Sequence, residues 1–269
     1  MGNVIRSDIY RLLRQKSFII CTAIVALLNL IIGPVGKLLY DISKRLAEGN
    51  DELMAELKEW SATFSVDKLI MNPLGNIDTI FVLLLIVWFA FGDLAHGYIK
   101  NVAGQLSNKG NIVFSKMAVI GIISLFMFIV AFAFQFLGLC LVQSPELSNI
   151  GESLVIFAVK WLSMLAIGSI ILLITVGLHS QTAGAIFAVL FGTGLLRFAY
   201  SISINKLMND VLKFEDFDVN QYMPDSILHT NDLTLQSKTL MIKAVIACIA
   251  FVCVLVPLTV SLFNKRDVK

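Results

Sequence analysis

Long apolar runs dominate this 269-residue sequence, and their length constrains the fold more than any other feature. The hydrocarbon core of a bilayer is about 30 Å thick, and a helix of roughly 20 apolar residues crosses it. In lipid each backbone polar group must be satisfied within its own segment, so these runs are expected to be helices. The sequence therefore predicts an all-α membrane protein with one domain, residues 1–269, and six spans at about residues 18–40, 77–92, 112–142, 154–177, 182–201 and 240–263.

The distribution of lysine and arginine among the segments that join the spans predicts the orientation of the chain. One set of segments holds ten basic and three acidic residues and comprises residues 1–17, 93–116, 178–181 and 264–269. The opposite set holds nine basic and sixteen acidic residues and comprises residues 37–78, 143–152 and 202–243. Because basic residues favour the cytoplasmic side, we expect both termini in the cytoplasm.

The first 17 residues have the pattern of a basic amphipathic helix. Apolar residues fall on one helical face, at Ile5, Ile9, Leu12 and Leu13. Basic residues occupy much of the remaining surface, at Arg6, Arg11 and Arg14. A helix of this kind is suited to the membrane interface, which is the interpretation we favour. The alternative is a charged flank that only fixes the topology.

Two of the non-cytoplasmic segments also show helical periodicity. Apolar residues recur at i, i+4, i+7 and i+11 after the first span, at Leu53, Leu57, Trp60 and Phe64. The segment between the fifth and sixth spans, residues 202–239, is too long for a structureless connection in a compact domain. We expect it to form an outer re-entrant or amphipathic region.

Two cationic side chains, Lys160 and Arg197, lie in the outer half of the predicted spans, and Gln135 lies at a similar depth. One interpretation is that the long cationic side chains extend to the outer surface. The other is a polar cluster that lines an outer vestibule or substrate path. Separately, Gly184, Ala188 and Gly192 repeat every four residues, a spacing that favours close helix packing in lipid, against another span or a second copy of the chain.

Several kinds of chemistry are missing from the sequence. There is no G-x-x-x-x-G-K-[ST] loop for nucleotide phosphates and no H-E-x-x-H motif for zinc. The four cysteines lie within apolar runs and form no C-x-x-C pair. Asp78 and Asp93 stand at the ends of the second span, where the helix termini and water are expected to solvate them. We therefore predict no catalytic residue, no metal site, no cofactor and no nucleic-acid partner.

The segment "DLAHGYIKNVAGQLSNKGNIVFSK", residues 93–116, interrupts this apolar chain with a short basic and polar stretch. It resembles the cytoplasmic segment of ABC-2 type permeases, which has an acidic residue, Gly-x-Ile-Lys-Asn, a small helix, a polar turn and Ser-Lys. The corresponding parts here are Asp93, "GYIKN" at 97–101, "GQLSNKGN" at 104–111, and Ser115 with Lys116. "NKGN" departs from the family, which often has a Ser/Thr-Arg pair there.

The resemblance implies a function for the chain. ABC-2 type permeases form dimers of membrane subunits, and each subunit is coupled after its second span to a separate cytoplasmic ATPase that binds ATP and Mg. The small size is similar to that of bacterial plasma-membrane members that export amphipathic or antimicrobial peptides, including phenol-soluble modulins and lantibiotics. On this basis the docking residues are expected to be Lys100, Asn101, Val102, Leu106 and Lys109.

Other functions remain open on the sequence. Export of lipid or polysaccharide is compatible with the same family. A self-powered secondary carrier would be favoured by ionisable groups that line a cavity at mid-membrane, and the predicted spans show none. A membrane anchor or immunity protein that binds a toxin without transporting it is also compatible with the sequence.

Overall fold

The computed structural model describes residues 2–46, 66–95, 110–142, 150–208, 213, 218–230, 233 and 238–265, and these residues form helices and short connections without any strand. The helices near the N-terminus and in the first half of the chain are α1 (Gly2–Arg14), α2 (Lys16–Leu46), α4 (Val66–Met71), α5 (Asn76–Ala95) and α7 (Gly110–Cys140). The second half contains α8 (Ile150–Leu178), α9 (Gln181–Thr193), α10 (Leu195–Lys206), the 3₁₀ turn η3 (Val219–Gln221), α11 (Pro224–His229) and α12 (Lys238–Lys265).

Five helical segments of the described chain are long and apolar enough to cross a membrane, and a sixth is present if the bent pair α9–α10 counts as one span. The five segments are Lys16–Leu46, Val66–Gly92, Gly110–Cys140, Ile150–Gly177 and Lys238–Lys265. This confirms the prediction that the described chain is all-helical, with several helices long and apolar enough to cross a membrane. Most predicted boundaries differ from the observed ones by a few residues, and the first span extends further, to Leu46.

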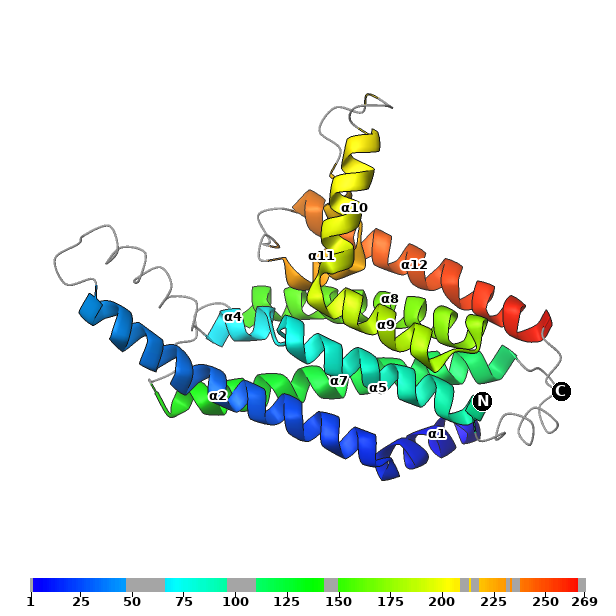
Figure 1. Cartoon of the computed structure of the whole chain (residues 1–269), viewed down its shortest axis with the longest axis horizontal. Coiled ribbons are helices and arrows are strands. Elements are labelled where there is room, and N and C mark those ends of the chain that lie inside the picture. The colour runs from blue at the N-terminus through cyan, green and yellow to red at the C-terminus, as the bar shows by residue number, and fades with distance from the viewer. Residues whose placement is uncertain are drawn as a thin grey trace.

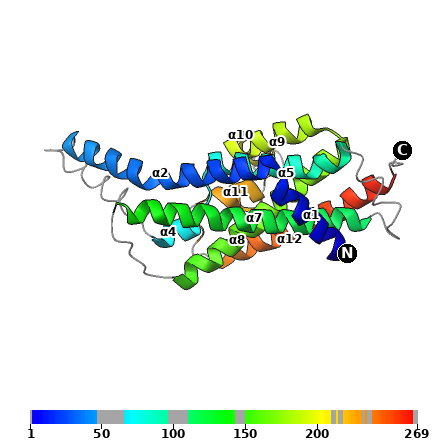
Figure 2. The ribbon, with the colours of Figure 1, turned by 90° about the horizontal axis from the view of Figure 1, so that it is seen from below.

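The long helices lie side by side along one axis of the molecule (Figure 1), and α2 and α7 are neighbours when the bundle is turned by 90° (Figure 2). The outward surfaces of these helices are apolar; examples are Ile19, Leu27, Ile129, Ile246 and Val254, which are all 53% or more exposed. Polar side chains lie inside instead, including Asn29, Thr79, Ser163 and Thr175, each fully buried. A surface of this kind is suited to lipid, where interior polar groups connect neighbouring helices.

Helices α2 and α7 cross at two glycines, Gly33 and Gly138. A Cβ atom on Gly33 would lie 2.5 Å from the carbonyl oxygen of Gly138, and one on Gly138 would lie 2.5 Å from the carbonyl oxygen of Leu30. The backbones therefore touch directly, which only glycine permits. The sequence motif "GPVG" contains Gly33, and α2 continues through its Pro34 to Leu46.

The predicted fifth span, 182–201, is not a single straight helix. It breaks at Gly194, whose φ of 76° is in the left-handed region that glycine adopts readily, and α9 and α10 meet there at 77°. Helix α9 runs alongside α5, whereas α10 projects from the bundle (Figure 1). The prediction of one continuous helix was wrong because the backbone turns at a single glycine. The apolar composition of the run gives no indication of such a turn.

The stripe of small residues on α9 faces helices of the same chain. Ala188 is completely buried. A Cβ atom on Gly184 would lie 2.5 Å from Oγ1 of Thr175 in α8, and one on Gly192 would lie 2.3 Å from Cγ1 of Ile80 in α5. The stripe therefore packs against neighbouring helices of the same chain rather than against a second copy of the chain.

Outside the spans, the structure gives part of what the sequence predicted. Residues 2–14 are helical, and the break at Gln15 separates α1 from α2. The region 202–239 contributes the end of α10, η3 and α11, and α11 packs against α8 and α12. The predicted amphipathic helix with Leu53, Leu57, Trp60 and Phe64 lies outside the described residues. The placement of α1 and α11 in a membrane interface stays a prediction.

Candidate functional sites at the two ends of the bundle

The segment predicted to dock an ATPase lies mainly outside the described residues, and so do Lys100, Asn101, Val102, Leu106 and Lys109. Its two flanks are described: α5 runs to Ala95, and α7 begins at Gly110. Both flanks lie at the end of the bundle where the chain begins and where α12 finishes (Figure 1). The predicted cytoplasmic elements are thus together at one end.

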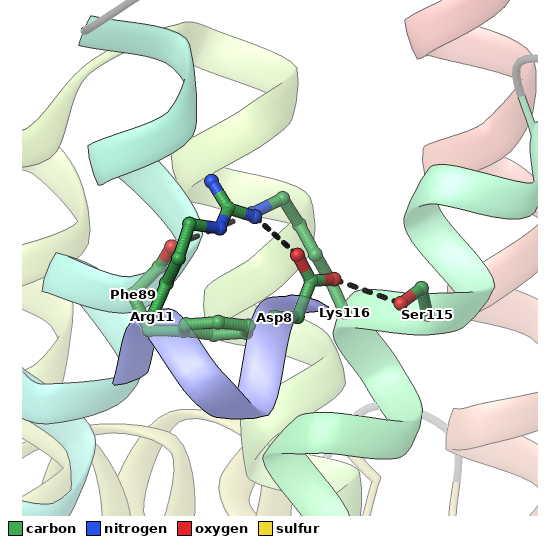
Figure 3. A network of polar contacts seen from close by, with 5 residues as sticks. All are labelled: Asp8, Arg11, Phe89, Ser115 and Lys116. Carbon is green, nitrogen blue, oxygen red and sulfur yellow. Dashed lines mark hydrogen bonds and ion pairs between the residues drawn. The ribbon is translucent and has the colours of Figure 1, made fainter. Parts of the chain in front are cut away.

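A buried polar network fixes α1 to this end of the bundle (Figure 3). Asp8 is 2% exposed, pairs with Arg11 of the same helix, and accepts a hydrogen bond of 2.8 Å from Oγ of Ser115 in α7. The next residue, Lys116, is 1% exposed; its Nζ lies 3.4 Å from the carbonyl oxygen of Phe89 and 4.7 Å from the centre of the Phe89 ring.

This network joins three helices next to the predicted docking segment, because Asp8 is on α1, Phe89 is on α5 and Ser115 with Lys116 opens α7. Buried charged groups are stable only when they are paired and hydrogen-bonded, so the network fixes the position of α1 on α7. The sequence analysis assigned no role to Asp8. It shares a helical face with Ile5 and Leu12, and an acid on the apolar face of a basic helix was a signal for such a contact.

At the opposite end, Lys160 of α8 is buried and does not reach the surface, since its exposed fraction is 1%. Its Nζ donates hydrogen bonds to Oδ1 of Asn72 and, at 2.8 Å, to the carbonyl oxygen of Thr230. Of the two interpretations of this residue, extension to the outer surface does not fit the geometry. Lys160 instead connects α8 to the turn before α5 and to the end of α11.

Replacement of Lys160 by methionine tests this role. We expect Lys160→Met to lower the free energy of unfolding by about 1–3 kcal/mol, because Asn72 and Thr230 lose a charged donor inside the protein. Removal of a charge from a merely extended side chain would be neutral or stabilising. The measurement is thermal unfolding in detergent, with Lys238→Met, at an exposed lysine of α12, as a matched control. Equal stability of both variants would contradict the connecting role.

Gln135 of α7 takes part in a second buried network that reaches the same turn. Its Nε2 donates to Oδ1 of Asn29 at 2.5 Å and to the carbonyl oxygen of Pro73 at 3.3 Å. Asp78 is 3% exposed, and its Oδ2 accepts a hydrogen bond from the backbone N–H of Gly75 at 3.2 Å. The backbone at the start of α5 therefore solvates this carboxylate, and the expected exposure to water is wrong because the turn before α5 folds over the start of that helix.

Arg197 of α10 lies near the same end but in a different environment. It is half-buried and lines a cavity of about 620 Å³ between α10, η3, α11 and the first turn of α12. Arg197 and Lys160 both act electrostatically on His229. The structure therefore brings these two predicted residues to one polar region, whereas Gln135 is connected to Lys160 through the adjacent residues Asn72 and Pro73.

Hydrogen bonds hold α10, η3 and α11 together around this cavity. Tyr200 Oη donates to Oδ1 of Asp225 at 2.5 Å and lies 2.8 Å from Oγ of Ser226. Ser226 in turn donates to Asn220, whose Nδ2 lies 2.9 Å from Oδ1 of Asp218. The sequence analysis did not anticipate this network, because its members are separated by segments without a periodic pattern.

The half-buried His229 predicts a pH-dependent stability. Burial, followed by the positive charges of Arg197 and Lys160, lowers the pKa of His229 from 6.5 to about 4. Between these values the unfolded chain binds a proton that the folded chain does not, so stability falls as the pH drops from 6.5 towards 4. The full difference corresponds to about 3 kcal/mol, and we expect about 1–2 kcal/mol because the side chain keeps partial contact with solvent.

The measurement is thermal unfolding in detergent between pH 7 and pH 4.5 for the parent and for His229→Gln. The stability of His229→Gln should depend much less on pH than the stability of the parent. Burial raises the pKa of the neighbouring Asp225, which acts in the opposite direction, since a raised carboxyl pKa makes stability fall as pH rises. Asp225 is present in both proteins, so the difference between them isolates His229. Parallel pH profiles would contradict the assignment.

Among the described residues, no three His, Cys, Asp or Glu side chains gather in a way that could hold a metal ion. Comparisons with known proteins found no matching family model, no similar curated protein and no similar solved structure. The candidate sites are therefore defined by their own geometry: the docking flanks with the Asp8 network at one end, and the cavity beside Arg197 at the other.

Proposed function

We propose that this chain is the permease subunit of an ABC exporter in a bacterial plasma membrane, with both termini in the cytoplasm. Two copies form a homodimer, and each copy binds a separate cytoplasmic ATPase that carries ATP and Mg. The exported substrates are amphipathic or antimicrobial peptides. The observation that carries the proposal is the segment 93–116, whose order of Asp93, "GYIKN", "GQLSNKGN" and "SK" resembles the ABC-2 pattern.

The surroundings of this segment support the proposal. The segment lies between two helices long enough to span a membrane, and its last two motif residues, Ser115 and Lys116, are both buried. Ser115 is hydrogen-bonded to Asp8 of α1, so a force applied to the segment reaches two helices at once. A rigid attachment of this kind is what a subunit without its own energy source requires.

Co-purification is the direct test. The chain is expressed together with each ATPase that contains a G-x-x-x-x-G-K-[ST] loop and that a search of the adjacent genes identifies. We expect the two to purify as a complex, and peptide substrate should stimulate ATP hydrolysis in liposomes. A membrane anchor or immunity protein would bind a toxin peptide but purify without the ATPase. A stable chain that binds no ATPase would therefore overturn the permease proposal.

A further inference from the structure

The cavity beside Arg197 combines a cation with an apolar wall. Its polar lining includes Arg197 and Asp218, and its apolar lining includes Phe198, Ile202, Ile227 and Leu240. Its volume of about 620 Å³ is within the usual range for small-molecule sites, roughly 300–1,000 Å³. A ligand that fits this lining has an anionic group next to an apolar part.

The Arg197 guanidinium is available to a ligand. No hydrogen bond or ion pair of this side chain is found within the described ranges. The guanidinium lies over the start of α10, because a Cβ atom on Gly194 would be 2.8 Å from Nη2 of Arg197. Gly194 provides no side-chain cap for the first N–H groups of α10. A half-buried guanidinium with open donors matches the two oxygens of a phosphate diester.

The acidic residues nearby are already engaged. Oδ1 of Asp218 accepts hydrogen bonds from Asn205 and from the backbone and side chain of Asn220, at 2.9–3.2 Å. Oδ1 of Asp225 accepts from Tyr200, and Asp225 is 1% exposed. Among the described residues of the lining, Arg197 is the cation, and its N–H groups are the charged donors that an anionic group can reach.

The position of the cavity fits the head-group region of a membrane. Helix α12 is long enough to span a bilayer, and its first turn contributes Leu240 to the lining. Helix α10 lies at 77° to α9, which packs along the bundle, so α10 would run close to the membrane plane if the bundle axis is normal to the membrane. Its apolar residues Leu195, Phe198 and Ile202 are 57%, 69% and 53% exposed, as expected of a helix whose apolar face contacts acyl chains.

We propose that this cavity binds the head group of a membrane phospholipid, with its phosphate on Arg197 and the upper part of its acyl chains along Phe198 and Ile202. A cation beside an apolar wall, next to the first turn of a spanning helix, matches a phosphate group with acyl chains beside it. The proposal does not depend on the transport function.

The test uses the purified full-length chain in detergent, freed of lipid, with bound ligand counted by native mass spectrometry. The probes are dioleoylphosphatidylglycerol, the phosphate-free dioleoylglycerol, and glycerol 3-phosphate without acyl chains. We expect one phosphatidylglycerol per chain at the site. Its Kd should rise at least tenfold in Arg197→Gln, less in Arg197→Lys, and not at all in Lys206→Gln, which changes a cation of α10 outside the cavity.

A second pair of variants keeps the test valid if Arg197→Gln does not fold. Ile202→Glu places a negative charge in the cavity lining, and Leu207→Glu places one outside it, at residues of nearly equal exposure, 53% and 52%. Only Ile202→Glu should weaken phosphatidylglycerol binding. Equal binding by both variants, or equal affinity for dioleoylglycerol or glycerol 3-phosphate, would overturn the proposal. The proposal would also be overturned if an amphipathic peptide displaced the lipid and if binding of that peptide required Arg197.

Discussion

Gly138→Ala is expected to lower the free energy of unfolding by about 2–3 kcal/mol, although it adds a single methyl group. The new Cβ atom would lie 2.5 Å from the carbonyl oxygen of Leu30 and 3.2 Å from its carbonyl carbon. These are backbone atoms of α2, so the clash cannot be relieved by a change of rotamer. The two helices must separate, and they lose contacts along the whole crossing.

Two other glycines provide matched controls. A Cβ atom on Gly121, also in α7, would lie 3.3 Å from a methyl group of Leu165, a flexible side chain, so Gly121→Ala should cost much less. Gly151, in the first turn of α8, has no atom within 4 Å of that position. Gly151→Ala should be neutral or stabilising, since alanine favours helix. The measurement is thermal unfolding in detergent. Equal stability of the three variants would show that the backbones of α2 and α7 are not in direct contact.

The spans were predictable because each helix is determined by the composition and length of its own segment. An apolar run long enough for a bilayer must satisfy its own backbone, and helix is the solution that a single run provides. The observed Gly110–Cys140 and Lys238–Lys265 therefore agree closely with the predicted 112–142 and 240–263. The break at Gly194 was not predictable in this way, since several glycines occur within these helices and only this one adopts a positive φ.

Contacts between distant segments were the part that the sequence did not reveal. Gly33 and Gly138 are each other's partners across more than a hundred residues, and neither has a periodic neighbour that marks it. Lys160 was recognised as unusual because a cation in a span is rare. Its partners Asn72 and Thr230 are ordinary polar residues in connections, and only the folded arrangement identifies them.

Leu106→Asp is expected to abolish binding of the partner ATPase, at a cost of several kcal/mol of binding free energy. Val102 and Leu106 are spaced at i and i+4, which places them on one side of a short helix if residues 101–110 are helical. In the proposed complex that side is buried in a groove of the ATPase. A carboxylate there would be desolvated without a partner.

Charge at the rim of the same contact should matter much less. Lys109→Ala is expected to slow association, mainly at low salt, because rim charges steer encounters more than they hold the complex. The measurements are a pull-down of the ATPase and substrate-stimulated ATP hydrolysis in liposomes, with thermal unfolding of each variant alone to establish that it is folded. If Leu106→Asp is folded, retains the ATPase and keeps full coupled hydrolysis, then residues 93–116 do not couple the chain to an ATPase, and the observation that carries the permease proposal is lost.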